Sequence, residues 1–462
     1  MKKFVFINPN RVLAHGSIWM AVSSICPPMG LAMLAAVLEN AGHYADIIDA
    51  DALNLSDDRI LQLISPDSTY VGITATTPEI ASVSRLAGRI RAARPDITII
   101  MGGVHPTVMH EELVGSGICD MVVRREGEGP ILALASGVPL EEIKELTWVR
   151  DGNVVVNPQS EEYVDLDSLP FPAYHKLPMH KYRSALGAAR RQPSISVITS
   201  RGCPGTCTFC YASMFGKRTR FMSAERILEH VALLQRDYGI REFAFHDDTF
   251  TADRERVETF CTKIIERNLD LSWSCLARVD SVSQDLLMLM KRAGCHQVGY
   301  GLESANQEIL ASMNKRMSSN AVADVVRWTR SAGLDVRGLF MLGNVGETED
   351  SLQHTLDYAL SLDLQYAVFN ITTPFPGTPL HNWAVQKGAL KHGDWSLYDY
   401  SHVILNLETV SSEAVERMYG HAYRTFYLRP GYIFDRIREI RTVDDLKVYF
   451  RVFVGIIKAA AG

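Results

Sequence analysis

Short apolar runs alternate with amphipathic segments along most of this chain, and the alternation restricts its fold more than any other feature. Between residues 1 and about 136, five runs are apolar nearly throughout, which suits parallel strands buried on both faces. The five predicted strands are Phe4–Ile7, Ala45–Ile48, Tyr70–Thr74, Ile97–Met101 and Met121–Val123. The segments between them that predict helices are Met29–Asn40, Asp57–Ile64, Glu79–Ala93 and Pro106–Val114. We therefore expect an α/β domain over residues 1–136 with a doubly wound parallel sheet.

Six further β/α units follow between Ser194 and about Lys387. The predicted strands are Ile195–Thr199, Glu242–His246, Ser272–Ala277, Gln297–Gly301, Asp335–Met341 and Tyr366–Ile371. The predicted helices are Ala224–Tyr238, Arg254–Arg267, Gln284–Ala293, Asn320–Ala332, Asp350–Ser361 and Leu380–Lys387. Repeated units of this length indicate a parallel barrel, and six units rather than eight indicate a partial one, which we place at residues 193–390.

Two other regions complete the chain. Asp151 and Gly152 lie between two β-rich runs within Leu146–Asn157, which predicts a hairpin. The proline-containing stretch Asp165–Lys181 predicts a linker, so residues 137–192 are expected to be hairpin and linker. Residues 391–462 are expected to be mainly helical, with runs such as Ser412–Tyr427 and Val443–Ala459 and with aromatic stripes that pack as core.

Composition excludes some classes of function. The 462 residues include 47 basic and 53 acidic side chains, which argues against a nucleic-acid surface. The N-terminal apolar run is too short for a signal peptide, and no window approaches the roughly 18 apolar residues of a membrane span. Five of the eight cysteines lie apart within apolar patterns, so we expect a reducing cytoplasm; they are Cys26, Cys119, Cys261, Cys275 and Cys295.

Polar and small residues collect after four of the first five strands. In doubly wound folds, ligands bind at the carboxyl ends of the strands. The residues at this edge are Asn8 and Pro9, Thr74 and Thr76, Gly102, Gly103 and His105, and Glu126 and Gly127. Each loop alone is consistent with ordinary turn chemistry, but four of them at one edge predict a ligand site.

Three cysteines stand close together just after the first strand of the second set. Cys203, Cys207 and Cys210 are separated by four and three residues, and Pro204 and Gly205 disfavour a helix between them. A structural zinc ion would want four ligands, whereas three thiolates on a four-iron cluster leave one iron open. The alternatives are a loop with unrelated cysteines or a zinc knuckle.

This loop, with Phe209 before its last cysteine, resembles the cluster loop of radical S-adenosylmethionine (SAM) enzymes. The N-terminal portion resembles the cobalamin-binding domain of one large branch of that family. The resemblance implies three cofactors: a 4Fe-4S cluster on Cys203, Cys207 and Cys210, SAM, and cobalamin.

The resemblance also implies SAM-binding residues at the strand ends of the barrel. They are Phe209, Asp247, Asp248, Arg278, Glu303, Ser304 and Gly343. The carboxylates of Asp247 and Asp248 stand where the family often has Gly-Gly-Glu and suit the methionine ammonium. Arg278 suits the methionine carboxylate, and Glu303 and Ser304 suit the ribose. Helix capping by either aspartate, a surface ion pair at Arg278 and plain turn chemistry at Gly343 are the alternatives.

Cobalamin domains of this shape place a hydroxyl residue after the third strand and two glycines after the fourth around the corrin and its nucleotide tail. Thr74, Thr76, Gly102 and Gly103 match those places. The Asp-x-His-x-x-Gly motif is absent, and neither His15 nor His105 stands in that pattern. We therefore expect no protein histidine on cobalt.

These features favour an enzyme that uses a 5′-deoxyadenosyl radical to activate an unactivated carbon of a small molecule. The expected reaction is methyl transfer, with an electron donor such as flavodoxin or ferredoxin as partner. A radical cyclase of the anaerobic magnesium-protoporphyrin ester cyclase type is the alternative. A non-catalytic cobalamin or redox sensor is a weaker alternative, because the cysteines, Arg278 and Glu303 are all present.

Overall fold

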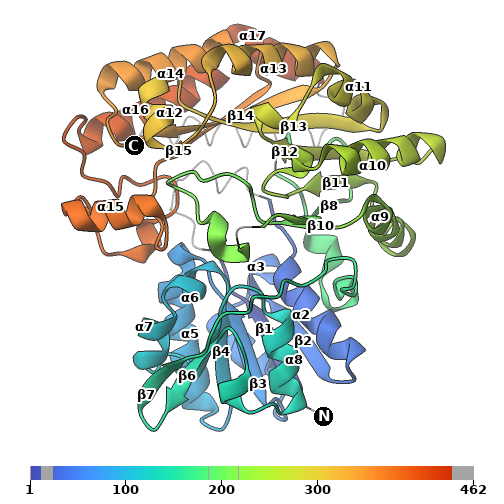
Figure 1. Cartoon of the computed structure of the whole chain (residues 1–462), viewed down its shortest axis with the longest axis vertical. Helices are drawn as coiled ribbons and strands as arrows, with labels where there is room; N and C mark the ends of the chain where they lie inside the picture. The colour runs from blue at the N-terminus through green and yellow to red at the C-terminus, as the bar shows by residue number, and fades with distance from the viewer. Residues whose placement is uncertain (1, 12–23, 186, 217, 440–462) are drawn as a thin grey trace. The chain divides into compact units, whose positions relative to one another are not determined.

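The computed structural model describes residues 2–11, 24–185, 187–216 and 218–439, and the chain forms two compact units (Figure 1). The first unit comprises Met1–Val12, Ile25–Tyr182 and Ser213–Met222. The second comprises Leu13–Ser24, Arg183–Ala212 and Ser223–Gly462. The helical run predicted over Val443–Ala459 lies outside the described residues.

Within the described residues, the first unit contains a seven-stranded sheet with the order β2-β1-β3-β4-β5-β6-β7. Strands β1 to β5 are parallel, which confirms the doubly wound prediction. The hairpin predicted around Asp151 is β6 and β7, and it extends this sheet antiparallel to β5. The strands are β1 (Lys3–Asn8), β2 (Tyr44–Asp49), β3 (Tyr70–Thr74), β4 (Thr98–Gly102), β5 (Met121–Val123), β6 (Leu146–Arg150) and β7 (Asn153–Val156).

Helices cover both faces of this sheet (Figure 1). They are α2 (Met29–Asn40), α3 (Ala50–Leu53), α4 (Asp57–Leu63), α5 (Ile80–Ala93), α6 (Val104–Val108), α7 (His110–Gly115) and α8 (Glu128–Ser136), and a short strand β10 (Arg220–Phe221) also belongs to this unit. The single helix predicted over Pro106–Val114 is wrong, because Met109 leaves helical geometry and separates α6 from α7. Helix α8 was not predicted; Gly129 and Pro130 in its first turn resemble a loop, although proline is tolerated there.

The sheet of the first unit is buried on both faces, as its apolar strands predicted. The four central residues of β1 are all buried. Gly72 in β3 makes room for the neighbouring strand, because a Cβ there would stand 2.6 Å from Cδ1 of Phe6. The side chains of this sheet therefore fill its core, and its free polar groups lie at the strand ends.

In the described part of the second unit, six parallel strands form a half-barrel sheet with the order β15-β14-β13-β12-β11-β8. The strands are β8 (Ser194–Val197), β11 (Glu242–Phe245), β12 (Ser272–Ala277), β13 (Cys295–Glu303), β14 (Asp335–Leu342) and β15 (Tyr366–Ile371), with a short β9 (Ser200–Arg201) after β8. The helices are α9 (Ala224–Tyr238), α10 (Arg254–Glu266), α11 (Gln284–Arg292), α12 (Gln307–Ser312), α13 (Ser319–Ser331), α14 (Glu349–Ser361), α15 (Pro379–Lys387), α16 (Ser412–Tyr427) and α17 (Pro430–Glu439). The expected six β/α units are confirmed, and neighbouring strands of this sheet follow one another along the chain except that β9 and β10 come between β8 and β11.

The two faces of the half-barrel differ in burial. Along β15, the residues Ala367, Phe369 and Ile371 are buried against helices, whereas Tyr366, Val368 and Asn370 are only partly buried. We call the face with the buried residues the outer face of the sheet and the face with the partly buried residues its inner face. On the outer side, Phe245, Phe250, Phe260 and Trp273 pack together with ring centres 4.6–6.1 Å apart. The inner face thus retains polar and partly exposed side chains, as a ligand-binding surface requires.

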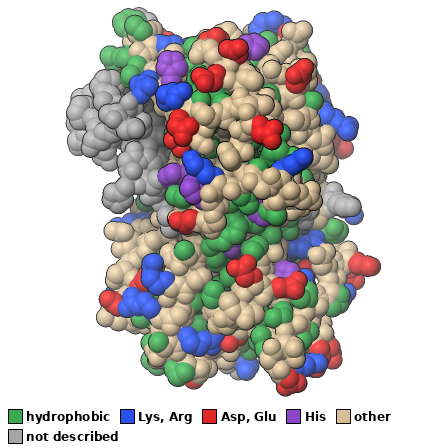
Figure 2. Space-filling view, turned by 90° about the vertical axis from the view of Figure 1, so that its left-hand side faces the viewer, with side chains coloured by type: hydrophobic (Ala, Val, Ile, Leu, Met, Phe, Trp, Pro, Cys, Tyr) green, Lys and Arg blue, Asp and Glu red, His purple; other side chains and the backbone are tan. Residues whose placement is uncertain are grey.

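The chain surface carries both signs of charge. Acidic and basic side chains are interspersed over the face shown in Figure 2. Among the helices of the described ranges, none combines the length and the apolar character needed to cross a bilayer. The mixed charge agrees with the near balance of acidic and basic residues in the sequence.

Helix α16 satisfies the open edge of the half-barrel at β15 (Figure 1). The backbone N–H groups of Ala367 and Phe369 donate to the hydroxyls of Tyr427 and Tyr423, each at 3.2 Å. The same hydroxyls donate to the carbonyls of those two residues at 2.7 Å and 3.0 Å. Two tyrosines therefore supply the partners that a seventh strand would otherwise provide.

Removing these hydroxyls should loosen the edge strand. We expect Tyr423→Phe and Tyr427→Phe each to cost about 1–3 kcal/mol, because a buried N–H and a buried carbonyl lose their partners. Amide hydrogen exchange should accelerate at Phe369 in the first variant and at Ala367 in the second. Tyr44→Phe, at an exposed tyrosine of the other unit, is the control and should leave both amides unchanged. Unchanged exchange in all three variants would contradict a structural role for the hydroxyls.

Candidate active site

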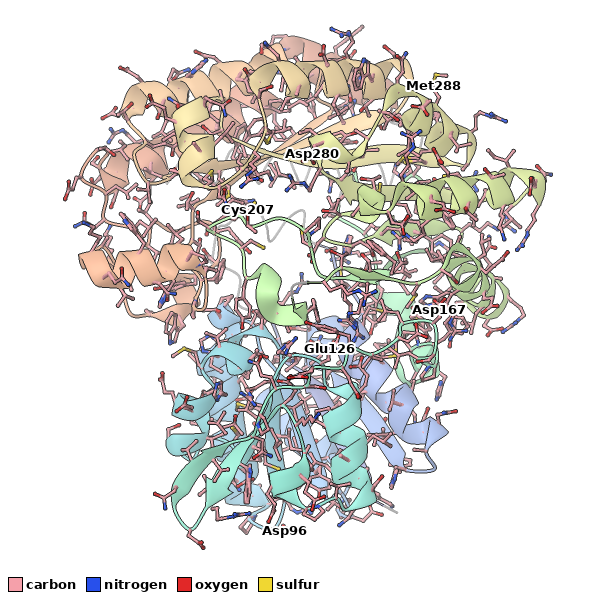
Figure 3. The ribbon with its side chains drawn as sticks, viewed as in Figure 1. Asp96, Glu126, Asp167, Cys207, Asp280 and Met288 are labelled. Atoms are coloured by element: carbon pink, nitrogen blue, oxygen red, sulfur yellow. The ribbon has the colours of Figure 1, made fainter. Side chains whose placement is uncertain are left out.

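The three cysteines lie on a tight loop after β9, and Figure 3 labels Cys207 on it. A Cβ on Gly205 would stand 3.4 Å from Sγ of Cys203 and 3.9 Å from Sγ of Cys207. The Gly205 N–H donates to Sγ of Cys203 at 3.4 Å. The backbone at Gly205 therefore runs close to both thiols, and its tightest neighbour is Nη1 of Arg278, 3.1 Å from where a Cβ would stand.

Hydrogen bonds and apolar packing fasten the same loop to neighbouring elements of the protein. The Thr208 N–H donates to the Met313 carbonyl at 3.0 Å, and the Thr208 carbonyl accepts from the Leu380 N–H at 2.9 Å. Phe209 packs into two apolar clusters, one around Met313 and Met341 and the other around Leu380. Phe209 thus anchors the loop, and its contact with SAM remains a prediction.

The thiols form one electrostatic group. Burial raises the pKa of Cys207 and raises that of Cys210 to about 12. The charge of Cys203 also raises the pKa of both, and the charge of Cys207 raises that of Cys210. Among the described residues, no three His, Cys, Asp or Glu side chains are placed to hold a single metal ion. A multi-iron cluster is larger than one ion, so the three spaced thiols fit it better than they fit zinc. Binding must release the thiol protons, because the coordinating form is the thiolate.

The two adjacent aspartates after β11 have different surroundings. Asp247 is fully buried and accepts from the N–H and the Oγ1 of Thr199, both at 2.6 Å. Its carboxylate also faces Nη2 of Arg256 at 3.5 Å. Asp248 is accessible; desolvation and the Asp247 charge raise its pKa, and its own charge raises the pKa of Cys210. Asp248 therefore faces the thiols, whereas Asp247 holds the scaffold.

Arg278 and Glu303 also reach the cysteine loop. Arg278 donates from Nε and Nη2 to the Asp280 carboxylate at 2.8 Å and 2.7 Å, and a Cβ on Gly205 would stand 3.1 Å from its Nη1. Asp280 is labelled in Figure 3. Glu303 lies at a register shift of β13 with φ of +60° and accepts from Nζ of Lys315 at 2.7 Å. The charges of Arg278 and Lys315 both lower the pKa of Cys207, so the two cations belong to the same site.

Lys315 is a site residue that the sequence did not reveal. It follows α12 in a loop without any recognisable motif, and burial opposes its charge, but Glu303 raises its pKa overall. Gly301 leaves the space for this pair, since a Cβ there would stand 2.8 Å from Nζ of Lys315. Tyr400 was likewise missed; it comes from the C-terminal region, and the charge of Cys210 raises its pKa.

Ser304 and Gly343 make mainly local contacts. Ser304 is buried, its hydroxyl lies 3.2 Å from Oγ1 of Thr355, and it accepts from the Asn306 N–H at 3.2 Å. The Gly343 N–H donates at 2.6 Å to Glu347, whose pKa burial raises to about 7. The geometry therefore gives Ser304 and Gly343 roles in loop structure, and their contacts with SAM remain predictions.

In the first unit, the predicted cobalamin residues do collect at the carboxyl edge of the sheet. A Cβ on Gly103 would stand 2.8 Å from Oγ1 of Thr74, so the loops after β3 and β4 touch. Asn8 donates to the Asp49 carboxylate at 2.8 Å, and Pro9 follows β1 at this edge. The Thr76 N–H donates to Glu79 at 2.9 Å, which starts the turn before α5.

Two residues of this edge are engaged within the protein. His105 is buried, lies 3.2 Å from Oγ1 of Thr77 through Nδ1, and has a pKa that burial lowers to about 4. The expectation that no protein histidine binds cobalt remains a prediction, and His15 lies outside the described residues. Glu126 accepts from Nη1 of Arg220 at 3.1 Å.

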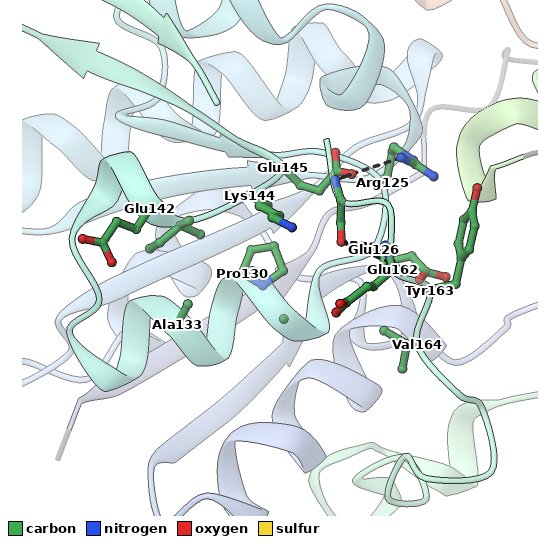
Figure 4. Close-up of a pocket in the computed structure, with 13 residues that line it drawn as sticks. Arg125, Glu126, Pro130, Ala133, Glu142, Lys144, Glu145, Glu162, Tyr163 and Val164 are labelled. Atoms are coloured by element: carbon green, nitrogen blue, oxygen red, sulfur yellow. Dashed lines mark hydrogen bonds and ion pairs between the residues drawn. The ribbon is translucent and has the colours of Figure 1, made fainter. Parts of the chain in front are cut away.

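A pocket of about 240 Å³ lies beside the start of α8 and includes Glu126 in its lining (Figure 4). Glu145 accepts there from Nη1 of Arg125 at 3.0 Å and from the Ser160 N–H at 2.9 Å. Its second oxygen, Oε2, is buried without a partner. Glu162 and Lys144 also line this pocket, so its charge is mixed and no single ligand class follows from it.

Removal of the thiols should abolish the cluster. We expect anaerobically reconstituted wild-type protein to hold about four irons and the triple variant Cys203→Ala, Cys207→Ala, Cys210→Ala to lose both iron and visible absorption, because three thiolates are removed. Cys261→Ala, at a buried cysteine of the same unit, is the control and should keep its iron. A full cluster in the triple variant would place the ligands among the other cysteines.

The two aspartates should separate in function. Asp248→Asn should weaken SAM binding about tenfold or more in anaerobic equilibrium dialysis, because one charge-assisted hydrogen bond is worth about 1.5–3 kcal/mol. Asp247→Asn should instead destabilise the fold by about 3–5 kcal/mol, because the buried Arg256 loses its counter-charge. If the Asp247 variant kept its stability but bound SAM more weakly, Asp247 rather than Asp248 would be the SAM-binding residue.

Comparisons with known proteins agree with this geometry. Residues 197–359 match the Radical SAM superfamily, and residues 18–135 match the B12 binding domain. A Pyrococcus horikoshii protein named as an uncharacterized methyltransferase is 35% identical over 92% of this chain and 93% of its own. The anaerobic magnesium-protoporphyrin IX monomethyl ester cyclase of Rubrivivax gelatinosus is 27% identical over 93% of this chain and 78% of its own.

Solved structures share the fold. The cobalamin-dependent SAM radical enzyme OxsB, with aqua-cobalamin and SAM bound, has a TM-score of 0.76 at 14% identity over 99% of this chain and 72% of its own. The radical SAM methyltransferase TsrM of Kitasatospora setae has a TM-score of 0.67 at 18% identity over 84% of this chain and 77% of its own. With both domains matched and a full-length relative at 35% identity, the chain belongs to the cobalamin-dependent radical SAM enzymes, and its cofactors are a 4Fe-4S cluster, SAM and cobalamin.

Proposed function

We propose that this enzyme transfers a methyl group to an unactivated carbon of a small molecule. The observation that carries the proposal is the methyltransferase named above, which is 35% identical over nearly the whole of both chains. A cytidylyl-2-hydroxyethylphosphonate methyltransferase of Streptomyces wedmorensis, 28% identical over 88% of this chain, supports the same reaction class.

In this proposal, the residues of the second unit bind the cluster and SAM. Cys203, Cys207 and Cys210 hold the cluster, Asp248 and Arg278 hold the amine and carboxylate of SAM, and Glu303 binds the ribose. Lys315 keeps the Glu303 carboxylate in place and adds positive charge beside the thiols. When bound, SAM and the cluster supply a carbon-centred radical, and cobalamin carries the methyl group.

The N-terminal edge residues would hold cobalamin. Asn8, Pro9, Thr74, Thr76, Gly102 and Gly103 provide small and polar contacts at the strand ends, and Gly127 packs against Leu34 at the start of α8. His105 and Glu126 support these loops from within the protein. A one-electron donor of the flavodoxin or ferredoxin class completes the proposal, because reductive cleavage of SAM needs an electron.

A cyclase is the second candidate, because the Rubrivivax enzyme covers nearly the same share of this chain. The two reactions differ in the fate of SAM. Methyl transfer uses one SAM to charge cobalt and another to make the radical, whereas cyclisation needs no methyl donor. The products of SAM therefore separate the candidates.

Isotopic label in the SAM methyl group tests the proposal. We expect the label in the product, with S-adenosylhomocysteine and 5′-deoxyadenosine formed in equal amounts, and neither product from the triple cysteine variant. Formation of 5′-deoxyadenosine without labelled product or S-adenosylhomocysteine would exclude methyl transfer and favour cyclisation. Candidate substrates are best drawn from the products of neighbouring genes.

A further inference from the structure

Arg337 lies in a row of side chains on the inner face of the half-barrel. Strand register pairs Leu276 with Gly299, Gly299 with Arg337, and Arg337 with Tyr366, so the row crosses four strands. His246 follows β11 next to Leu276 and is accessible, and desolvation and then the Arg337 charge lower its pKa. His246 and Arg337 therefore lie on the same face of the sheet, on either side of Leu276 and Gly299.

Among the residues that the structure describes, no carboxylate pairs with the guanidinium of Arg337. Its Nε is buried without a hydrogen-bond partner, and its Cζ lies 5.6 Å from the centre of the Tyr366 ring. Burial lowers the pKa of Arg337, and the groups that oppose this shift are the tyrosine hydroxyls of Tyr427, Tyr366 and Tyr432 rather than carboxylates. A charged group with a buried N–H that lacks a partner is costly, so the retention of Arg337 is explained by an anion that binds it.

The acid closest along the strand is already engaged. Asp335, two residues before Arg337, faces Nη2 of Arg190 at 2.9 Å and Nη1 of Arg330 at 3.5 Å. Those contacts also fasten residues 187–190 across the amino-terminal end of the inner face. The Gly187 carbonyl accepts from Gln297 at 2.9 Å, and the Ala188 carbonyl accepts from Ser274 at 3.4 Å. Protein therefore closes this end, and Asp335 is not available to Arg337.

A second cation reinforces the positive field. Nη1 of Arg436 donates to the Tyr366 hydroxyl at 3.1 Å, and its Cζ lies 5.5 Å from the centre of the same ring. Arg337 and Arg436 thus flank one tyrosine. Planar guanidinium groups bind carboxylates and phosphates through paired N–H donors, which a lysine cannot imitate.

We propose that Arg337 binds an oxyanion of the substrate, a carboxylate or a phosphate or phosphonate group, on the inner face of the half-barrel. The inference rests on the proposed function in that the ligand is the molecule to be methylated. His246 and Tyr366 line the same subsite, and Leu276 supplies its apolar wall. The substrate class is therefore an acid rather than a neutral hydrocarbon.

Small anions test this subsite in the full chain. Inorganic phosphate and acetate are titrated separately at constant ionic strength, and the midpoint of thermal unfolding is measured. Wild-type protein should show a saturable upward shift with one of them, because a ligand that binds only the folded state stabilises it. A shift with phosphate alone indicates a phosphate or phosphonate, and a shift with acetate alone indicates a carboxylate. Arg337→Met should lose the shift, and Arg254→Met, at an exposed ion pair, should retain it.

The stability of the variants distinguishes a binding role from a structural one. In anion-free buffer, Arg337→Met should be at least as stable as the wild type, because a charged group whose buried N–H has no partner has been removed. Arg256→Met, which breaks the contact with Asp247, should be less stable. If Arg337→Met does not fold, Arg337→Lys takes its place and should weaken anion binding at least tenfold.

Three outcomes overturn the proposal: a wild-type protein without an anion shift, a shift that persists at full size in the Arg337 variant, or an Arg337 variant that is less stable than the wild type in anion-free buffer. Neither readout requires turnover. Labelled product without an anion shift would therefore remove the subsite and keep the methyl transfer, and an anion shift without labelled product would do the opposite.

Discussion

A buried charge pair at the root of the cysteine loop positions the rest of the second unit's site. Asp247 accepts two hydrogen bonds from Thr199, and Arg256 of α10 donates to the Thr199 carbonyl at 3.1 Å and to the Phe250 carbonyl at 2.7 Å. A buried ion pair is tolerated only when such additional hydrogen bonds satisfy it. Because Thr199 precedes the cysteine loop and Asp248 follows Asp247, this network sets where the thiols and the accessible carboxylate stand. Thr249 extends it to the loop itself, with Oγ1 3.7 Å from Sγ of Cys203.

The two sheets prepare for their cofactors in different ways. The first sheet is packed on both faces, so its ligand surface is confined to the loops at the strand ends, where Gly103 allows two loops to touch. The half-barrel packs only its outer face, and its inner face keeps partly exposed side chains along β14 and β15. Gly299 and Gly301 leave β13 without side chains at two positions between Gln297 and Glu303. The same α/β alternation therefore yields an edge site in one unit and a face site in the other.

Much of this architecture could be predicted from the sequence, because continuous apolar runs identify buried parallel strands. Strands β12 and β15 have the predicted bounds, and the carboxyl ends of the strands led to most site residues. The sequence pattern could not assign different roles to two adjacent residues of the same type. Asp247 is buried and Asp248 is accessible, but both simply follow the same predicted strand. Lys315 and Tyr400 reach the site from loops, where tertiary packing and not local pattern sets the position. The packing of Phe209 and the buried, unpartnered Nε of Arg337 also become visible only in the folded chain.

The capping of β15 by α16 has a consequence for how the chain is made. A ribosome completes β15 at Ile371 well before it reaches α16 at Ser412, so the nascent half-barrel displays a bare strand edge during synthesis. Such an edge invites pairing with another chain. Once α16 has folded, the hydroxyls of Tyr423 and Tyr427 form hydrogen bonds with the backbone of β15. The edge is then no longer exposed, and side chains do not create a new strand edge. Helix α16 is thus a late safeguard against misassembly, and a product truncated before it would leave the sheet open to strand exchange.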